Sequence, residues 1–438
     1  MSKRTAPPEP AEARGFEDVE HLRLQSILTD GVTGLSLLPD LRNERVANLG
    51  VIYVQLGRFS GVESLYGWEL YDRVLQLTAD SLRADLSTSP LKGCLLSMQF
   101  TGADGFHLLF DLRGRTEEGR RGRLEDEARR FKDGVIQRLR QGLGRTSVDL
   151  MTVHATCLKV ADDPRVRPSR NVVRGLQEAA RLAGVREGQD RQETMSQFKS
   201  IVAGRKLRAV YQPVLDIQHD AVIGYEALIR GPAGGGLESP DVLFAAAREA
   251  GLELEFDNLC LETIFGGVPG AARGKKLFVN ASSKLLAHSV FLDERNLSRI
   301  QRAHPQVVME VSEKEVVIDY AAFREVLERL RSSGLEIAID DAGSGYSGLE
   351  SILQLRPEYI KVAESIVHRL HEDTIKREII TAFASLGKQI NASLVAEGIE
   401  QPEELESLLA LGVGYGQGFL LGRPRRPPSG CARCGGCP

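Results

Sequence analysis

The sequence predicts an α/β protein whose second half forms a barrel of parallel strands. Three observations carry this prediction. The chain has 438 residues, which is enough for two or three domains. Beyond residue 209, apolar runs of about four to six residues alternate with amphipathic helical patterns. Most of these runs contain or end in one polar residue, as expected where strand ends meet at the mouth of a barrel.

The composition is typical of a soluble globular protein. Hydrophobic residues make up 42% of the chain and charged residues 26%, which is sufficient for packed cores. The net charge of −4 argues against DNA binding, because DNA-binding proteins are normally basic. The chain has no apolar stretch long enough to span a membrane, and its start lacks the core of a signal peptide. We therefore expect no DNA partner, no membrane association and a cytoplasmic location.

Changes in composition divide the chain into four segments. Residues 1–20 are polar and are predicted to be a disordered tail. Residues 21–186 form a first α/β domain, and residues 187–425 form a second one that begins with a charged connector helix. Residues 426–438 are a tail rich in proline and cysteine, with its cysteines at Cys431, Cys434 and Cys437. They offer three metal ligands without a histidine, so a metal site and a mobile, oxidisable tail both stay open.

Helix boundary signals in the second half support the strand–helix alternation. In "ESPDVLFAAAREAG", Ser239 suits the N-cap, Pro240 the first helical position and Gly251 the stop. In "SGLESIL", Ser347 and Glu350 have the spacing of a capping box. The structural alternative is an open, doubly wound sheet, which would gather fewer strand ends at one site.

The polar residues at the predicted strand ends form the candidate site. They are Glu226 in "IGYEAL", Asn280 in "KLFVNAS", Glu310 in "VVMEVSE", Asp340 and Asp341 in "EIAIDDAGSG", Lys361 in "EYIKV", Glu397 in "SLVAEGIE" and Gln417 in "GYGQGFLLG". Any one of them alone would be interpreted as a helix cap or a surface residue. In a barrel they converge, and carboxylates gathered at one mouth repel one another unless cations neutralise them.

The chemistry of these side chains predicts two divalent cations. Carboxylate and amide oxygens without histidine favour Mg²⁺ or Mn²⁺ over Zn²⁺. Two such ions can activate a water and stabilise the leaving oxygen of a phosphodiester. Lys361 could orient the water or neutralise charge on the phosphoryl group. Glu397 could either ligate a metal or accept the proton.

The second half of the chain resembles the EAL-domain phosphodiesterases that hydrolyse cyclic di-GMP. The blocks "YQPV", "YEALIR", "FVNAS", "MEVSE", "DDAGSGYSGL", "YIKV", "VAEGIE" and "GYGQGFLLGRP" occur in the family's order between residues 195 and 425. The resemblance implies a modified (β/α)8 barrel, commonly a homodimer through this domain. It also implies metal-dependent hydrolysis of one phosphodiester bond by a cyclic-guanylate-specific phosphodiesterase, giving linear pGpG.

The resemblance also implies a role for each matching residue. The implied metal ligands are Glu226, Asn280, Glu310, Asp340 and Asp341. Lys361 and Glu397 are similar to the residues that position and activate the water, and Glu226 acts with them in catalysis. The implied substrate-binding residues are Gln212, Arg230 and Gln417. Glu313 resembles the glutamate that anchors the loop after the paired aspartates, which links the site to the dimer interface.

The chain departs from the family at two alanines. Ala342 replaces the usual phenylalanine after the aspartate pair, and Ala363 replaces the aspartate two residues after Lys361. Glu364 follows where arginine is common. Ala363 puts the rate in doubt, because it removes a carboxylate close to the lysine.

The first half resembles a degenerate GGDEF domain, the fold of diguanylate cyclases. Metal-binding carboxylates are replaced by Gln55 and Gly57, and the five-residue turn ends in Gly105 and Phe106 where the family has glutamate and phenylalanine. Further replaced positions are Glu63 and Ser64 at the guanine site and Gly93 and Leu96 at the inhibitory site. Without metal ligands two triphosphates cannot be positioned, so we expect no cyclase activity and a regulatory or dimerising role. Trp68 is expected to fill the vacated pocket.

Three functions follow from these observations. The leading one is a cyclic di-GMP phosphodiesterase. The alternative is a receptor that binds cyclic di-GMP without cutting it and signals to an unknown protein partner. A scaffold made of both domains would leave the clustered carboxylates unexplained.

Overall fold

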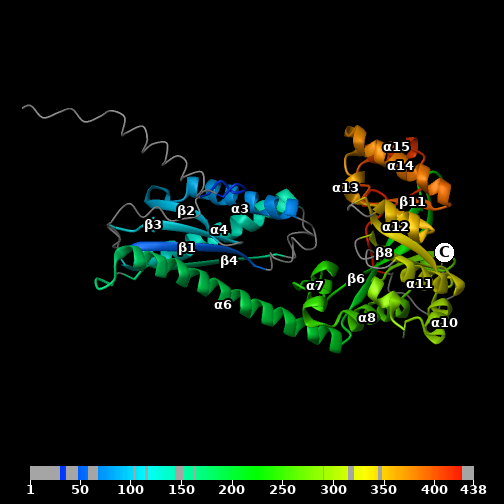
Figure 1. Ribbon diagram of the computed structural model, residues 1–438, viewed down its shortest axis with the longest axis horizontal. Helices are drawn as coiled ribbons and strands as arrows, with labels where there is room; N and C mark the ends of the chain where they lie inside the picture. Colours follow the sequence, from blue (N-terminus) through cyan, green and yellow to red (C-terminus); the bar gives the residue numbers. More distant parts are fainter. Residues whose placement is uncertain are drawn as a thin grey trace, which may run out of the picture. The chain divides into compact units, whose positions relative to one another are not determined.

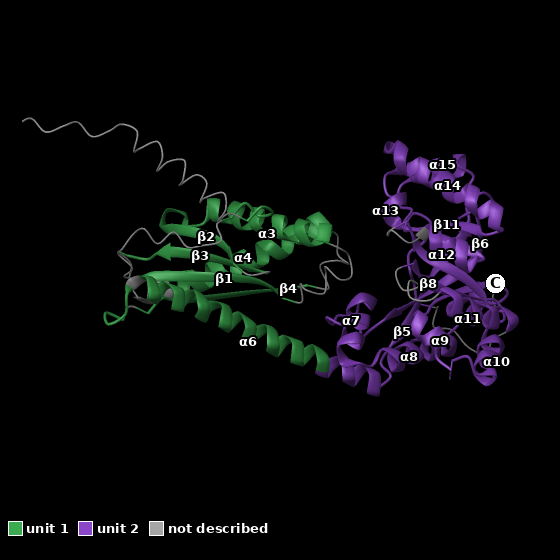
Figure 2. Cartoon of the chain, in the orientation of Figure 1, with its two compact units in different colours: residues 1–195 green, residues 196–438 purple. Residues whose placement is uncertain are grey.

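The protein is described by a computed structural model. It describes residues 30–35, 48–57, 68–101, 104–113, 117–143, 151–161, 163–289, 291–313, 320–343 and 348–426. The chain forms two compact units, Met1–Met195 and Ser196–Pro438 (Figure 2). The predictions for residues 1–20, Glu63, Ser64, Ser347 and the cysteine tail fall outside the described residues.

Unit 1 contains a four-stranded antiparallel sheet in the order β2-β3-β1-β4. The strands are β1 (Leu49–Gly57), β2 (Leu95–Thr101), β3 (Gly105–Asp111) and β4 (Thr152–Lys159), with a short 3-10 turn, η1 (Lys92–Cys94), before β2. Both faces of β1 are buried, since its residues alternate between two apolar clusters. An antiparallel sheet with both faces covered needs helices on each side.

Three helices cover that sheet. Helices α3 (Trp68–Thr88) and α4 (Glu117–Leu143) pack on the face carrying Ile52, and α6 (Pro168–Ala203) packs on the face carrying Val51 (Figure 1). The predicted connector is the C-terminal part of α6, which continues past the boundary between the units. Trp68 is 64% exposed, so the prediction that it fills a pocket is wrong.

Unit 2 is a closed eight-stranded barrel, which rules out the open sheet. Its strands are β5 (Arg208–Asp216), β6 (Ala221–Arg230), β7 (Lys276–Asn280), β8 (Val307–Ser312), β9 (Glu336–Ala342), β10 (Tyr359–Val362), β11 (Ser393–Ala396) and β12 (Tyr415–Gly416). Strand β5 runs antiparallel to β6 and β12, and the other pairs are parallel. The expectation of parallel strands alone fails at β5, because the turn 217–220 is too short for a crossover.

Helices and short turns connect the barrel strands. They are α7 (Pro240–Ala250), α8 (Glu253–Gly266), η2 (Gly270–Ala272), α9 (Ser283–Ala287), α10 (Glu294–Ala303), α11 (Tyr320–Ser332), α12 (Gly348–Leu355), α13 (Glu364–Val367), η4 (Leu370–Glu372), α14 (Thr374–Ile390) and α15 (Pro402–Ala410). The predicted limits of α7 are confirmed, with Gly251 in the left-handed conformation at φ 65°. Ser239 is the N-cap residue, but its side chain makes no capping hydrogen bond.

The interior of the barrel is filled with side chains. Six buried residues from six strands form one apolar cluster: Val214, Phe278, Val308, Ala338, Tyr359 and Val395. A filled interior leaves the strand ends as the place where polar groups meet. Among the described residues, no helix has the length and apolar character needed to cross a bilayer.

Candidate active site at the barrel mouth

The strand ends of unit 2 carry most of the predicted site residues. Glu226, Asn280, Glu310, Asp340 and Lys361 lie on the five neighbouring strands β6 to β10. Glu397 directly follows β11, and Gln417 directly follows β12. The backbone N–H groups of both residues extend the strand ladder, bonding to the carbonyls of Val362 and Ala396 at 3.1 and 2.8 Å.

Lys361 lies at the centre of this cluster and is fully buried. Its Nζ is 2.7 Å from Glu310 Oε1 and 2.7 Å from Glu397 Oε1. Asp340 Oδ1 is 3.2 Å away and Glu226 Oε2 is 3.4 Å away. One ammonium therefore faces four carboxyl groups, and its single charge cannot neutralise all of them when they are ionised.

Two amide side chains complete the cluster. Asn280 Nδ2 donates to Glu226 Oε1 and to Glu310 Oε2, both at 3.0 Å. Gln417 Nε2 donates to Glu226 Oε2. Since the Asn280 amide nitrogen bridges two carboxylates, its oxygen is left to face another group.

Burial and charge shift the pKa values of these groups in different directions. Burial and the neighbouring Glu226 carboxylate hold the pKa of Glu310 well above its usual range. Burial and Asp340 do the same for the pKa of Glu397. Burial disfavours the charged form of Lys361, but the surrounding carboxylates outweigh it and raise its pKa. For Glu226, Lys361 and the two amides outweigh burial and lower its pKa.

The two adjacent aspartates lie in a β-bulge of strand β9. The register between β9 and β10 shifts at this point: Ile339 pairs with Ile360, and Ala342 pairs with Val362. Asp341 has a φ of 58°, in the left-handed region that aspartate tolerates better than most residues. Neighbours in a regular strand face opposite sides of the sheet, and the bulge breaks this alternation. Among the ion pairs of the described residues, Lys361 pairs with Asp340 and not with Asp341.

The predicted substrate-binding residues of the first two strands lie beside Glu226. Gln212 on β5 is in register with Glu226 and donates from Nε2 to the Gly422 carbonyl at 3.0 Å. Arg230 ends β6, and burial lowers the pKa of its guanidinium. Its NH1 donates to the Ile229 carbonyl at 2.8 Å.

Glu313 is fully buried although it follows a strand end. Its Oε2 accepts a hydrogen bond from the Gly343 N–H at 2.9 Å, just after the paired aspartates. Gly343 has a φ of 88°, which favours glycine. Sequence reasoning did not single out Gly343, although the glycine after "DDA" was the available signal.

The two unusual alanines are neighbours in space. The Ala363 N–H donates to the Ala342 carbonyl at 3.2 Å, and both side chains are buried. Ala363 is the N-cap residue of α13 and offers no side-chain hydrogen bond to it. Glu364 follows as an exposed residue, and the partial desolvation of its carboxyl group together with the neighbouring Glu400 raises its pKa. The site therefore has an uncapped short helix next to Lys361.

The donor atoms at the mouth suit Mg²⁺ or Mn²⁺. All are carboxylate or amide oxygens, the ligands that these hard cations prefer. Glu310 Oε1 and Asp340 Oδ1 are buried, and among the described residues their contacts are the ion pairs with Lys361. Within the described residues no three acidic, histidine or cysteine side chains are already arranged to hold an ion. Since Lys361 Nζ lies among the carboxylates, cation binding requires some of them to turn away from it.

Comparison with known proteins identifies the family. The EAL domain family model matches residues 195–424, more than half of the chain, so the protein belongs to this family. The bifunctional diguanylate cyclase/cyclic di-GMP phosphodiesterase MucR of Pseudomonas aeruginosa is 27% identical over 403 residues, which cover 88% of this chain and 56% of MucR. The probable cyclic di-GMP phosphodiesterase PdeN of Escherichia coli is 30% identical over 222 residues, covering 49% of this chain and 42% of PdeN.

Solved structures of related domains are similar as well. The PaMucR phosphodiesterase in complex with c-di-GMP is 29% identical, with a TM-score of 0.46, covering 53% of this chain and 97% of that one. The EAL enzyme Bd1971 in its cGMP-bound form is 22% identical, with a TM-score of 0.50, covering 63% and 78%. The chain spans about half the length of the curated relatives it matches.

Proposed function

We propose that unit 2 hydrolyses cyclic di-GMP to linear pGpG in a reaction that depends on Mg²⁺ or Mn²⁺. The observation that carries the proposal is the cluster of four carboxylates around the buried Lys361 at the barrel mouth. Keeping so much negative charge together is costly unless cations bind there. The relatives MucR and PdeN, named as cyclic di-GMP phosphodiesterases, support the same substrate.

The proposed cation ligands are Glu226, Asn280, Glu310, Asp340 and Asp341. When bound, the cations would neutralise the phosphodiester and make a water molecule more acidic. The reaction forms one phosphorus–oxygen bond to water and breaks the bond to the 3′-oxygen, which leaves as the hydroxyl of pGpG. The chain itself must hold the water, accept its proton and orient the phosphate.

Individual residues supply those three contributions. Glu397, whose carboxylate lies 2.7 Å from Lys361 Nζ, accepts the proton of the water. Lys361 orients the water and offsets charge on the phosphoryl group. Gln417 fixes Glu226 by a hydrogen bond. Arg230 and Gln212, at the edge of the mouth, contact the phosphate and the substrate.

The second candidate is a receptor that binds cyclic di-GMP without cutting it and signals to a protein partner. It is favoured by Ala363, which leaves the N-cap position of α13, two residues after Lys361, without a carboxylate. It is disfavoured by the presence of all five proposed ligands together with Lys361 and Glu397.

We propose that unit 1 is a GGDEF-like regulatory or dimerising module without diguanylate cyclase activity. A Cβ atom at Gly105 would lie 2.1 Å from the Tyr53 hydroxyl, so a glutamate fits there only if the Tyr53 side chain moves. A Cβ atom at Gly57 would lie 2.3 Å from Thr152 Oγ1. Neighbouring side chains have therefore taken the space that the missing carboxylates would need.

The test is to incubate the purified chain with cyclic di-GMP and Mg²⁺ or Mn²⁺ and to separate the products by chromatography. We expect pGpG, abolished by EDTA and by Glu226→Gln. The matched control is Glu294→Gln, an exposed glutamate at the start of α10, which should leave turnover unchanged.

Other outcomes decide between the remaining functions. Tight binding in calorimetry without any product would make the chain a receptor. Absence of both product and binding would refute both proposals and leave a scaffold.

A further inference from the structure

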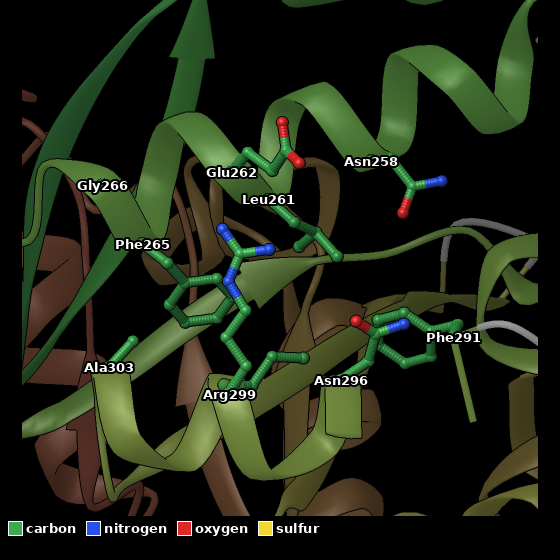
Figure 3. Close-up of a pocket in the computed structure, with 10 residues that line it drawn as sticks. Asn258, Leu261, Glu262, Phe265, Gly266, Phe291, Asn296, Arg299 and Ala303 are labelled. Carbon is green, nitrogen blue, oxygen red and sulfur yellow. The ribbon is translucent and has the colours of Figure 1, made fainter. Parts of the chain in front are cut away.

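A cavity lies between two outer helices of unit 2, and none of the proposed active-site residues lines it. It has a volume of about 210 Å³ and opens between α8 and α10 (Figure 3). Residues of α8 and α10 line it, together with Phe291 from the segment between α9 and α10. Nothing in the proposed hydrolysis uses them.

The cavity has an apolar floor and a polar rim. Leu261, Phe291 and Ile300 are buried, with exposed fractions of 6%, 4% and 7%, and they form the floor. Asn258 and Glu262 from α8 face Asn296 and Arg299 from α10 across the opening. Such a distribution suits a ligand with one apolar part and one polar end.

The charge of the rim favours an anionic ligand. Glu262 is already paired with Arg205, in the turn after α6. Arg299 extends from α10 toward α8 in Figure 3, and among the described residues it has no ion-pair partner. A guanidinium with free donors binds a carboxylate through two parallel hydrogen bonds. The unpaired positive charge thus lies directly above an apolar floor.

The volume limits the apolar part to one ring. An apolar cavity of about 150 Å³ is enough to hold benzene. The additional space at the α8–α10 cavity is sufficient for a short carboxylate arm reaching Arg299. We propose that this cavity binds a small aromatic carboxylate, with the ring on the Leu261–Phe291–Ile300 floor and the carboxylate on Arg299.

The probe for this proposal is 4-fluorophenylacetate, observed by fluorine NMR during titration with the full-length chain. The neutral analogue is 2-(4-fluorophenyl)ethanol, which keeps the ring and loses the charge. Arg299→Gln removes the guanidinium, and Arg302→Gln makes the same change on α10 at a residue that does not line the cavity. Ala303→Phe fills the cavity from its edge.

We expect saturable binding of the acid, weakened by about tenfold or more in Arg299→Gln and unchanged in Arg302→Gln. The neutral alcohol should bind the unchanged chain about tenfold or more weakly than the acid does, because it cannot pair with Arg299. Ala303→Phe should abolish binding of the acid. No saturable binding of the acid would overturn the proposal. Equal effects of the two arginine variants, or binding that survives Ala303→Phe, would also overturn it. Because the readout is binding alone, the result does not depend on whether cyclic di-GMP is hydrolysed.

Discussion

The buried Lys361 is the residue on which the electrostatics of the site depend. A lone ammonium without exposure would normally lose its proton, but four carboxylates within 3.4 Å keep it charged. Removing one member of a buried ionic group leaves the others uncompensated, which costs more than the group contributes as a whole. Lys361 therefore both holds the site together and competes with cations for the same oxygen atoms.

Lys361→Met should separate catalysis from ligand binding. The variant keeps the length of the side chain but removes the charge that orients the water, so kcat should fall by at least about a hundredfold. The dissociation constant for cyclic di-GMP, measured by calorimetry, should change by no more than about threefold. Lys388→Met, an exposed lysine on α14, is the matched control. An unchanged kcat in Lys361→Met would show that the assignment of the active site is wrong.

The metal-free protein should lose stability as pH rises. Glu310 and Glu397 have pKa values raised well above 4.5, so their stabilising contribution is complete below that value. It is lost as pH increases through the raised values, because ionisation then costs more in the folded state. The pKa of Glu226 is lowered instead, so its contribution to stability is complete above its usual pKa and is lost only at lower pH.

This effect can be measured by thermal unfolding in EDTA and in Mn²⁺ at about pH 5.5 and about pH 8. We expect the melting temperature in EDTA to be lower at the higher pH, and Mn²⁺ to raise it most there. Glu310→Gln should make the melting temperature in EDTA depend less on pH, because one of the three carboxyl groups of the cluster with a raised pKa is gone, Glu397 and Asp340 being the others. A melting temperature that rises with pH in EDTA would contradict the proposed electrostatics.

At the scale of the elements, strand–helix alternation was sufficient to predict that the candidate site residues converge at the barrel mouth. Asn280, Glu310 and Asp340 follow one another at intervals of 30 residues, and in the barrel they lie on adjacent strands. The ends of parallel strands meet at one mouth whatever the details of the helices, so convergence needed only the right fold class.

The conformation within β9 could not be predicted in the same way. A regular strand would direct Asp340 and Asp341 to opposite faces, and no pattern in "AIDDAG" indicates a bulge or a left-handed Asp341. The position of Lys361 at the centre of the cluster could not be predicted from the sequence either, since it depends on distances among four strands and the loop after β11. Tertiary packing sets local geometry of this kind, and patterns in a single sequence carry no information about it.

Ala363→Asp tests the N-terminus of α13. Aspartate at this N-cap should stabilise the helix by about 1 kcal/mol. It also returns a carboxylate next to Lys361, so we expect turnover of cyclic di-GMP to rise. Ala363→Asn is the matched control, because asparagine caps as well as aspartate but carries no charge. Equal rates in both variants would assign any gain to capping, and no gain in either would mean that Ala363 does not limit the enzyme.

At the scale of the whole molecule, the predicted homodimer can be tested at exposed apolar residues of unit 2. Leu349 and Leu353 lie one turn apart on α12 and are 58% and 55% exposed. Ile375, on α14, is 72% exposed. We propose that the two leucines of α12, which share one face of the helix, form the centre of the dimer interface. Helix α12 begins only a few residues after Gly343, which Glu313 holds by a hydrogen bond next to Asp341.

On this proposal the chain is a homodimer, and Leu353→Asp should convert it to a monomer and lower the turnover of cyclic di-GMP at the same time. A charge at the centre of an apolar interface is desolvated without a partner, whereas in the monomer it stays in water and leaves the fold intact. Sedimentation velocity measures the mass, and chromatography of pGpG measures the rate. Leu409→Asp, at an exposed leucine on α15, should change neither. A monomeric variant with full turnover would show that dimerisation and the site are independent. A variant that stays dimeric would place the interface elsewhere on the chain, and then the short path from Asp341 to α12 would have no role in coupling the two active sites.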